Sequence, residues 1–303
     1  MGYGYGYGYG YGYGYGYGYG YGGGSGGGGA FRNMPAELGL KPWTLDYTPD
    51  ISGNPDLPQR RNPASALQYP LSLWDPALIA GLAATEFAME FAKWSVADSV
   101  LIPATDLGWR STNPNSEAFI QQEIDRLLAL MADDRDRYMP EIIAQADNAP
   151  LYWYELLNLG GGEKPATNAL INFAQRVGEA AALYFKMQYK RVRPSTVCPG
   201  LLLPFGPPRH PAFPSGHSLT GHLTTYLLNE IPNVQTNVGP ELTWLADRVA
   251  TNRERAGLHY QTDSVGGQKI GEEIGRLLAK AIPPDKIVSD TFDKILLAAK
   301  AEW

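Results

Sequence analysis

Three short segments of the sequence carry side chains suited to binding a tetrahedral oxyanion. The first is basic: Lys186 is followed after six residues by Arg193 and Pro194. A proline disfavours the helical conformation in the residue before it, so we expect a helix that carries Lys186 to end close to Arg193. Taken alone, this stretch is equally typical of an ordinary helix C-terminus, where the helix dipole favours cations.

The second segment reads Pro-Ala-Phe-Pro-Ser-Gly-His-Ser over residues 211–218. Proline and Ser215 before an apolar run indicate the start of a helix, where free backbone N–H groups favour an anion. Gly216 allows the backbone to approach such an anion closely, and His217 would project beside it. The alternative is an ordinary N-cap followed by a core histidine.

The third segment contains Arg253, His259 and Asp263. His259 and Asp263 are four positions apart, so they share a face if this segment is helical. A carboxylate on one imidazole nitrogen fixes the tautomer and leaves the other nitrogen as nucleophile or ligand. Arg253 adds a permanent planar cation suited to phosphate-like oxygens. The alternative is a surface helix of mixed charge.

Together, the order and spacing of these segments form a three-part signature over residues 186–263. It consists of Lys, six residues and Arg-Pro; then Pro-Ser-Gly-His; then Arg, five residues, His, three residues and Asp. The sequence thereby resembles the type 2 phosphatidic acid phosphatase and vanadium haloperoxidase superfamily, and most resembles its soluble bacterial members. One departure is Asn252, where a serine usually precedes the arginine of the third part.

The resemblance implies a helical bundle and a cradle for one phosphate or vanadate. Lys186, Arg193 and Arg253 would bind the nonbridging oxygens, and Ser215 with the Gly216 N–H would complete the cradle. Donors arranged in this way act where negative charge develops in a transition state.

The resemblance also assigns the catalytic roles. His259 would attack phosphorus to form a phosphohistidine, and Asp263 would orient it. His217 would protonate the leaving oxygen and then activate water. This chemistry requires no metal or cofactor, and the expected substrate is a small, soluble phosphate ester.

The same cradle can hold vanadate, in which case the expected activity is a haloperoxidase that uses hydrogen peroxide and a halide. His259 would then be the vanadium ligand and His217 would assist peroxide. His210 lies five residues before Ser215, where bromide-oxidising relatives commonly have a histidine, so it is a candidate for assisting halide or peroxide. His222 is interpreted as structural.

The helical signals that must position these residues recur along most of the chain. No sustained two-residue alternation bounded by hairpin turns is present, so the expected fold is all-α, a helical bundle. Proline in a first turn, polar caps and apolar residues at helical spacing mark the helices. They are expected over residues 75–100, from 115 through at least 131, and over 167–189, 215–229, 242–257, 263–281 and 291–299.

The chain divides into three parts by composition. Residues 1–29 are a Gly-Tyr repeat with a Gly-rich spacer. We interpret them as a disordered tail, because the repeat has no second type of apolar side chain with which to pack a core. A rival interpretation is that its tyrosines drive self-association, which makes a non-catalytic assembly protein the third candidate function. Residues 30–74 form an irregular arm, and residues 75–303 form the catalytic domain.

The composition and charge of the chain limit the classes of partner and site that we expect. The chain has 303 residues and a formal net charge of −6, which argues against general binding of nucleic acid. Its single cysteine, Cys198, excludes an internal disulfide and a cysteine-based metal site. There is no apolar run long enough to span a membrane and no secretory signal pattern, so we expect a cytoplasmic protein, with a periplasmic or secreted location left open.

Overall fold

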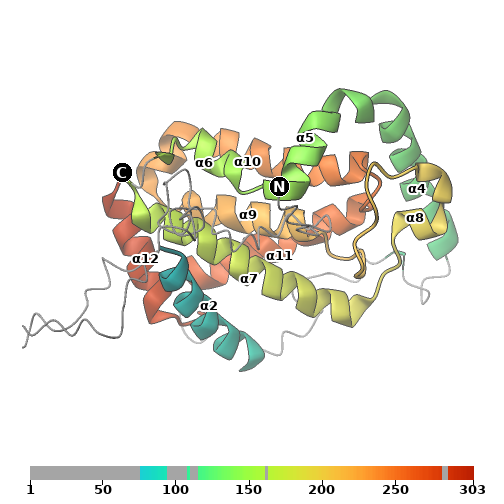
Figure 1. The fold of residues 1–303 in the computed structure, drawn as a ribbon. Helices are drawn as coiled ribbons and strands as arrows, with labels where there is room; N and C mark the ends of the chain where they lie inside the picture. The colour runs from blue at the N-terminus through green and yellow to red at the C-terminus, as the bar shows by residue number, and fades with distance from the viewer. Residues whose placement is uncertain (1–75, 94–107, 110–114, 161–162, 282–285) are drawn as a thin grey trace, which may run out of the picture.

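The computed structural model describes residues 76–93, 108–109, 115–160, 163–281 and 286–303. In these residues the regular structure is helical throughout, which confirms the predicted all-α class (Figure 1). The predicted tail at 1–29 and arm at 30–74 lie outside the described residues. None of the helices in the described ranges is long and apolar enough to cross a membrane.

Most helix bounds lie within two residues of the predictions, and the predicted end of the first helix at residue 100 lies outside the described residues. α10 begins at Pro232, ten residues before the predicted start, and continues through Pro240. α5 and α6 were not predicted at all. The elements are α2 (Pro76–Lys93), α4 (Ser116–Asp133), α5 (Arg135–Asn148), α6 (Leu151–Leu156), α7 (Pro165–Tyr189), α8 (Pro194–Val197), the 3-10 turn η6 (Pro199–Leu201), α9 (Gly216–Leu228), α10 (Pro232–Arg255), α11 (Gln261–Ala279) and α12 (Asp290–Ala301).

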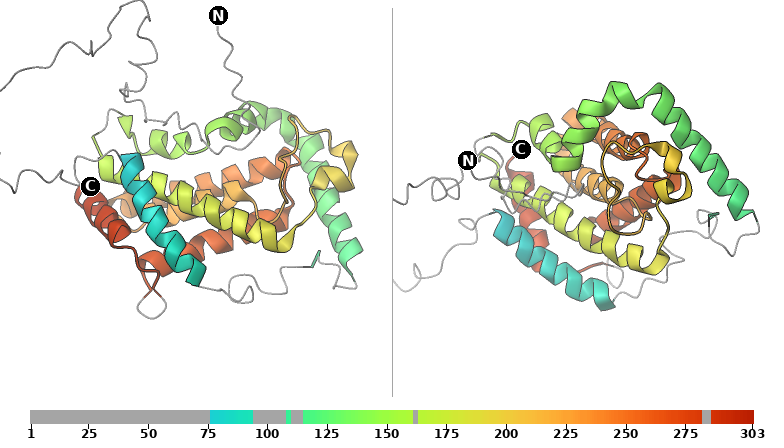
Figure 2. Two further views of the ribbon diagram at one scale, coloured as in Figure 1. Left: turned by 60° about the horizontal axis from the view of Figure 1, so that its bottom comes forward. Right: turned by 45° about the vertical axis from the view of Figure 1, so that its right-hand side comes forward.

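The core is built around α9, which α7, α10 and α11 surround (Figures 1 and 2). Eleven of its 13 residues are buried. Leu219, Leu223 and Leu227 recur at four-residue spacing and are fully buried. Because α9 is buried around most of its surface, neighbouring helices cover it on several sides, which is the position of a central helix. α2 and α12 pack against the outer side of α7.

Two glycines allow α11 to lie directly against α9. A Cβ atom at Gly267 would lie 2.6 Å from the Ser215 carbonyl oxygen, and one at Gly271 would lie 2.5 Å from the Leu219 carbonyl oxygen. Any larger residue would therefore push the two helices apart. The close packing brings the starts of both helices together, and the Ser215 N–H donates to the Asp263 carbonyl oxygen at 2.9 Å.

The chain after α7 turns as the sequence predicts. The helix ends at Tyr189, and Lys190 takes the left-handed conformation at φ 50°, ψ 33°. Arg193, before Pro194, is extended at φ −69°, ψ 149°. Lys186 is thus in the last turn of a helix, and Arg193 is on the extended segment that follows it. α4 and α5 pack against α10 near this end of the bundle (Figure 1).

Candidate active site

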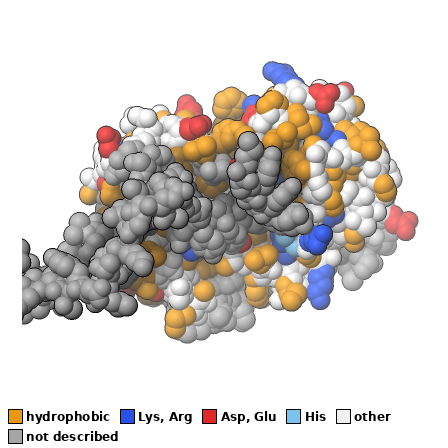
Figure 3. Space-filling view, in the orientation of Figure 1, with side chains coloured by type: hydrophobic (Ala, Val, Ile, Leu, Met, Phe, Trp, Pro, Cys, Tyr) orange, Lys and Arg blue, Asp and Glu red, His pale blue; other side chains and the backbone are white. Residues whose placement is uncertain are grey.

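The predicted site residues meet where α9 and α11 begin and where α7 and α10 end (Figure 1). The site is enclosed: the three cations and the His-Asp pair are all buried, and His217 and His210 are half-buried. On the face drawn in Figure 3, a small patch of histidine reaches the surface beside Lys and Arg side chains. The buried members are Lys186, Arg193, Arg253, His259 and Asp263.

Lys186 binds the segment that leads into α9. It is 1% exposed, and its ammonium group donates to the carbonyl oxygens of Pro211 at 2.9 Å, Ala212 at 3.0 Å and Pro214. An ammonium group has three protons, and three carbonyls accept them. Lys186 therefore fixes this loop and adds positive charge to the site. To donate directly to an oxyanion, its ammonium group would have to give up its hydrogen bond to one of the three carbonyl oxygens.

Arg193 links the loop to the expected nucleophile. Its Nη1 donates to the Leu258 carbonyl oxygen at 2.7 Å and lies 3.1 Å from His259 Nε2. On its other side, Nε donates to the His210 carbonyl oxygen at 3.0 Å and Nη2 lies 2.9 Å from His210 Nδ1. Because a guanidinium group only donates, His259 Nε2 accepts from it, whereas His210 Nδ1 also lies 3.0 Å from the Pro211 carbonyl oxygen. The structure thus brings His210 into the site through Arg193.

Arg253 has unused hydrogen-bonding capacity. It is 1% exposed, and its Nη2 donates to the Ile142 carbonyl oxygen at 2.6 Å. Its Nε and Nη1 are buried and have no hydrogen-bond partner among the described residues. Unpaired buried donors on a charged group are costly, so they indicate a site built for an acceptor. A tetrahedral oxyanion can accept from both nitrogens in the fork geometry that arginine presents.

The start of α9 has the predicted form. Ser215 is the N-cap, and its Oγ accepts from the Ser218 N–H at 3.4 Å. Gly216 is the first helical residue, so its N–H belongs to the unpaired group at a helix N-terminus. His217 Nε2 lies 3.2 Å from the Gln145 carbonyl oxygen, which makes this nitrogen the donor.

His259 and Asp263 are paired, with His259 before α11 and Asp263 on it, as the predicted helix bounds imply. α11 begins at Gln261, so His259 lies two residues before it and Asp263 lies in its first turn. His259 Nδ1 is 3.3 Å from Asp263 Oδ2, which also accepts the Tyr260 N–H at 3.0 Å. This geometry assigns the proton to Nδ1 and leaves a lone pair on Nε2, which faces Arg193.

Burial and positive charge act together on the histidines. Burial, together with the charge of Arg253, lowers the pKa of His217 to about 3. Burial and the charge of Lys186 lower the pKa of His210 to about 3. Burial and then Arg193 hold the pKa of His259 well below its usual value, although the bond to Asp263 opposes them. All three imidazoles are therefore neutral near pH 7.

Two residues of the site were missed in the sequence. Arg191 was visible in the basic segment but received no role, and it is buried with its Nη1 donating to Asp263 Oδ1 at 2.7 Å. Glu123 of α4 accepts from Arg191 Nη2. Spacing could not reveal Glu123, because it lies 68 residues from Arg191 in the chain.

Asn252, the departure from the usual serine, has a specific function in the packing of α10 against α5. It is fully buried, and its Nδ2 donates to Glu141 Oε1 at 3.0 Å and to Gln145 Oε1 at 2.9 Å. Its Oδ1 accepts from Arg255 Nη1 at 2.8 Å. The longer amide reaches across to α5, which in turn contacts Arg253 and His217 through backbone carbonyls.

His222 is hydrogen-bonded to residues outside the predicted site. It is buried, with Nδ1 2.7 Å from the Ser218 carbonyl oxygen and Nε2 3.1 Å from Asp247 Oδ1. Cys198 is a free, half-buried thiol. Among the described residues, no three His, Cys, Asp or Glu side chains are grouped to hold a metal ion.

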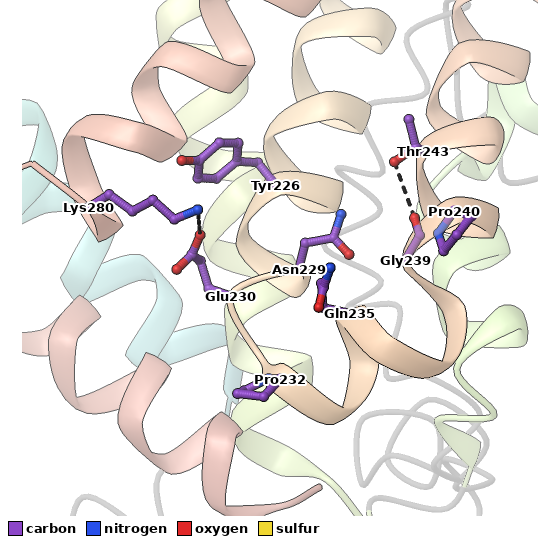
Figure 4. Close-up of a pocket in the computed structure, with 9 residues that line it drawn as sticks. All are labelled: Tyr226, Asn229, Glu230, Pro232, Gln235, Gly239, Pro240, Thr243 and Lys280. Atoms are coloured by element: carbon purple, nitrogen blue, oxygen red, sulfur yellow. Dashed lines mark hydrogen bonds and ion pairs between the residues drawn. The ribbon is translucent and has the colours of Figure 1, made fainter.

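A separate cavity of about 680 Å³ lies at the opposite end of α9 (Figure 4). α9 has 13 residues, so its two ends are about 20 Å apart. Tyr226, Asn229 and Glu230 line the cavity, and Glu230 pairs with Lys280 at 3.0 Å. None of the predicted site residues lines this cavity.

The comparisons with known proteins match the chain to solved structures only. No protein-family model matches the chain, and neither does any curated protein. One solved structure that aligns with it is described as the first transmembrane PAP2-type phosphatidylglycerolphosphate phosphatase from Bacillus subtilis. The alignment covers 66% of this chain and 92% of that one, with 17% identity and a TM-score of 0.29. The function proposed below therefore rests on the side chains of the site.

Proposed function

We propose that the protein hydrolyses small phosphate monoesters through a phosphohistidine on His259, without a metal. The observation that carries this proposal is the buried Arg253 guanidinium, whose Nε and Nη1 have no partner among the described residues. The charges of Arg253 and Arg193 both act on His217, and Arg193 Nη1 lies 3.1 Å from His259 Nε2, which supports a single pocket formed by these residues.

The charge of the pocket fits a dianion. The candidate site has three cations, Lys186, Arg193 and Arg253, against one carboxylate, Asp263, because the neighbouring Arg191 is also paired with Glu123. Burial and the charge of Arg193 hold the pKa of Lys186 well below its usual value, and a bound anion would favour its charged form. The excess of two positive charges matches a phosphate monoester at neutral pH. The N–H groups at the start of α9 add to this field, since the N-terminus of a helix carries partial positive charge.

In the proposed reaction, His259 Nε2 attacks phosphorus and the bond from phosphorus to the ester oxygen breaks. His217 gives a proton to the leaving alcohol oxygen, so the alcohol departs neutral. Water then attacks the phosphohistidine, His217 takes its proton, and the N–P bond breaks to release phosphate. Asp263 stabilises the positive charge that His259 acquires while it is phosphorylated.

His217 needs a proton for the first step, although its pKa in the protein alone is about 3. Burial and Arg253 depress this pKa. A dianion bound beside Arg253 would offset the positive charge and raise the pKa of His217. Substrate binding would therefore help to protonate the general acid, and the acid would be charged mainly in the complex.

The test is a paired assay on one preparation of the full chain. We expect hydrolysis of p-nitrophenyl phosphate in the presence of EDTA, inhibition by micromolar vanadate, and an acid-labile phosphoenzyme after rapid quench. The His259→Ala variant should lose both hydrolysis and the phosphoenzyme, whereas His222→Gln serves as the control for loss of a histidine. Hydrolysis that persists in His259→Ala would exclude the proposed mechanism.

A second candidate, vanadium-dependent haloperoxidase, is favoured by the position of His210. Its Nδ1 lies 2.9 Å from Nη2 of Arg193, the arginine that also contacts His259. The unpaired donors of Arg253 suit vanadate as well as phosphate, because both are tetrahedral oxyanions. Arg253 and Arg193 would hold vanadate and His259 Nε2 would bind the vanadium. Bound vanadate would supply activation of peroxide toward a halide.

The same preparation distinguishes the two candidates. Bromination of monochlorodimedone that requires vanadate, peroxide and bromide, without hydrolysis of the ester, would replace the phosphatase proposal. His210→Ala should then reduce bromination strongly. Under the phosphatase proposal the same variant retains most of its hydrolysis, because His210 contacts Arg193 and has no assigned step.

A further inference from the structure

The His259–Asp263 pair is connected to α4 by a buried arginine that lies outside the expected anion-binding set. Arg191 is 5% exposed, and its Nη1 donates to Asp263 Oδ1 at 2.7 Å. Its Nη2 donates to Glu123 of α4. One guanidinium group therefore joins two carboxylates from distant parts of the chain.

Aromatic rings fix the plane of this guanidinium group. The Cζ atom of Arg191 lies 3.8 Å from the centre of the Tyr260 ring and 4.6 Å from that of Trp109. Cation–π contacts at these distances are favourable and direct the N–H groups sideways. The two carboxylates lie at the edge of the plane, where a guanidinium group donates.

Glu123 also holds the first turn of α11. Its Oε1 accepts from the Thr262 N–H at 3.0 Å and from the Thr262 hydroxyl at 2.6 Å. Thr262 Oγ1 in turn accepts from Arg191 Nη1 at 2.7 Å. Glu123 is thus bound both to Arg191 and to the residue that precedes Asp263.

We infer that Arg191 and Glu123 are positioning residues, which hold the Asp263 carboxylate in the one orientation that directs His259 Nε2 into the pocket. The two oxygens of Asp263 have separate partners. Oδ1 accepts from Arg191, while Oδ2 accepts from His259 Nδ1 and the Tyr260 N–H. With Oδ1 bound, the carboxylate cannot rotate away from the imidazole.

Arg191 also keeps Asp263 charged. Burial alone would raise the pKa of Asp263, but the adjacent Arg191 and the bond to His259 hold it well below its usual range. Without Arg191 this pKa rises, and a protonated Asp263 no longer stabilises a positive His259. The charged or titratable groups that face Asp263 are Arg191, His259, Tyr260, Lys186, Glu254 and Glu123.

The inference rests on the proposed function for its kinetic readout, so the experiment includes a measurement that is independent of activity. The variants are Glu123→Gln, Arg191→Lys and Arg191→Gln. The matched control is Arg126→Gln, which removes another ion pair of α4, between Arg126 and Glu254 at 3.3 Å. Proton NMR of the full chain reports the His259 Nδ1–H resonance, which is identified by its absence in His259→Ala.

We expect Glu123→Gln and Arg191→Gln to shift or broaden the His259 Nδ1–H resonance. We expect kcat to fall about tenfold to a hundredfold, the effect common for residues that orient a functional histidine, with KM changed less than about threefold. The acid limb of the pH profile should move to higher pH. Arg191→Lys should recover part of kcat, because it keeps the charge but cannot bridge both carboxylates.

The outcomes separate the two proposals. A folded Glu123→Gln variant with an unchanged His259 resonance and unchanged kcat would overturn the inference. If Arg191→Gln does not fold, the Glu123→Gln variant alone provides the test. A shifted resonance in a chain whose wild type hydrolyses no phosphate ester would support the positioning role and refute the phosphatase. Equal losses of kcat in Arg126→Gln would show that any ion pair of α4 matters, which also overturns the inference.

Discussion

Replacing Arg253 with methionine should make the protein more stable in the absence of anions and remove its response to them. Arg253 is fully buried, with one hydrogen bond to the Ile142 carbonyl oxygen and two nitrogens that have no partner among the described residues. Each unpaired buried donor costs about 1–3 kcal/mol. Methionine has a similar length and no donors, so it fills the space without this cost.

The balance of these terms gives the magnitude. Losing two unpaired donors contributes about 2–6 kcal/mol of stability, and losing the charged bond to Ile142 removes about 1.5–3 kcal/mol. The midpoints of these ranges give a net gain of about 2 kcal/mol, within limits of about −1 to +4.5 kcal/mol, and each kcal/mol corresponds to about 2–4 °C in Tm for a domain of this size. The anion-free variant should therefore melt a few degrees above the wild type.

The rise in Tm that vanadate causes should be smaller in Arg253→Met than in the wild type. Vanadate at 100 times its Kd stabilises the wild type by about 2.7 kcal/mol, which is about 5–11 °C. Losing two charge-assisted hydrogen bonds weakens binding by about 3–6 kcal/mol, so the same concentration would raise the Tm of Arg253→Met by less than about 2 °C.

Differential scanning fluorimetry with and without vanadate measures both effects. The control is Arg276→Met, which removes an arginine of α11 whose ion pair with Glu273 is exposed. It should keep the wild-type response. If Arg253→Met shows the same vanadate-induced shift as the wild type, Arg253 does not bind the anion and the reasoning from its unpaired nitrogens is refuted.

Three further predictions concern the histidines and Asn252. His259→Gln should abolish the acid-labile phosphoenzyme seen after rapid quench while leaving vanadate binding weakened but measurable by thermal shift. The pKa of His217 is about 3 in the folded protein and about 6.5 in the unfolded chain. Between these values the imidazole binds a proton only in the unfolded state, so the free energy of unfolding falls as the pH drops below about 6.5. Unfolding by urea between pH 7 and 5 should show this loss, and His217→Asn should reduce its slope by up to about 1.4 kcal/mol per pH unit. Asn252→Ser should destabilise the protein by about 1–3 kcal/mol in urea, because Glu141 and Gln145 each lose a buried donor; unchanged stability would mean that the serine is equally well accommodated.

The sequence predicts the parts of this structure that local chemistry controls. Pro194 predicts the C-terminus of α7, and Ser215 as N-cap predicts the N-terminus of α9. Both predictions are confirmed. α11 is also close to its predicted range, since its buried face recurs at helical spacing. Its start lies two residues before the predicted one, and His259 stays outside the helix as the predicted bounds imply.

What the sequence could not predict depends on contacts between distant segments. α5 is polar along much of its length and contains Pro140, so its sequence has little apolar periodicity. It is helical because Ile142 and Gln145 are buried against α10 and the site. The same applies to Glu123, whose function arises only when α4 packs beside the start of α11.

The arrangement of helix ends explains why so much positive charge is tolerated in one pocket. Lys186 and Arg253 lie in the last turns of α7 and α10, where the negative end of the helix dipole stabilises a cation. α9 and α11 present their N-terminal turns from the other side, near Ser215 and Asp263. The cations are thus held by two helices, and the N–H groups in the first turn of α9 add to a field that favours an anion. Because Gly267 sets the distance between α9 and α11, the packing of the core and the geometry of the site are controlled by the same contact.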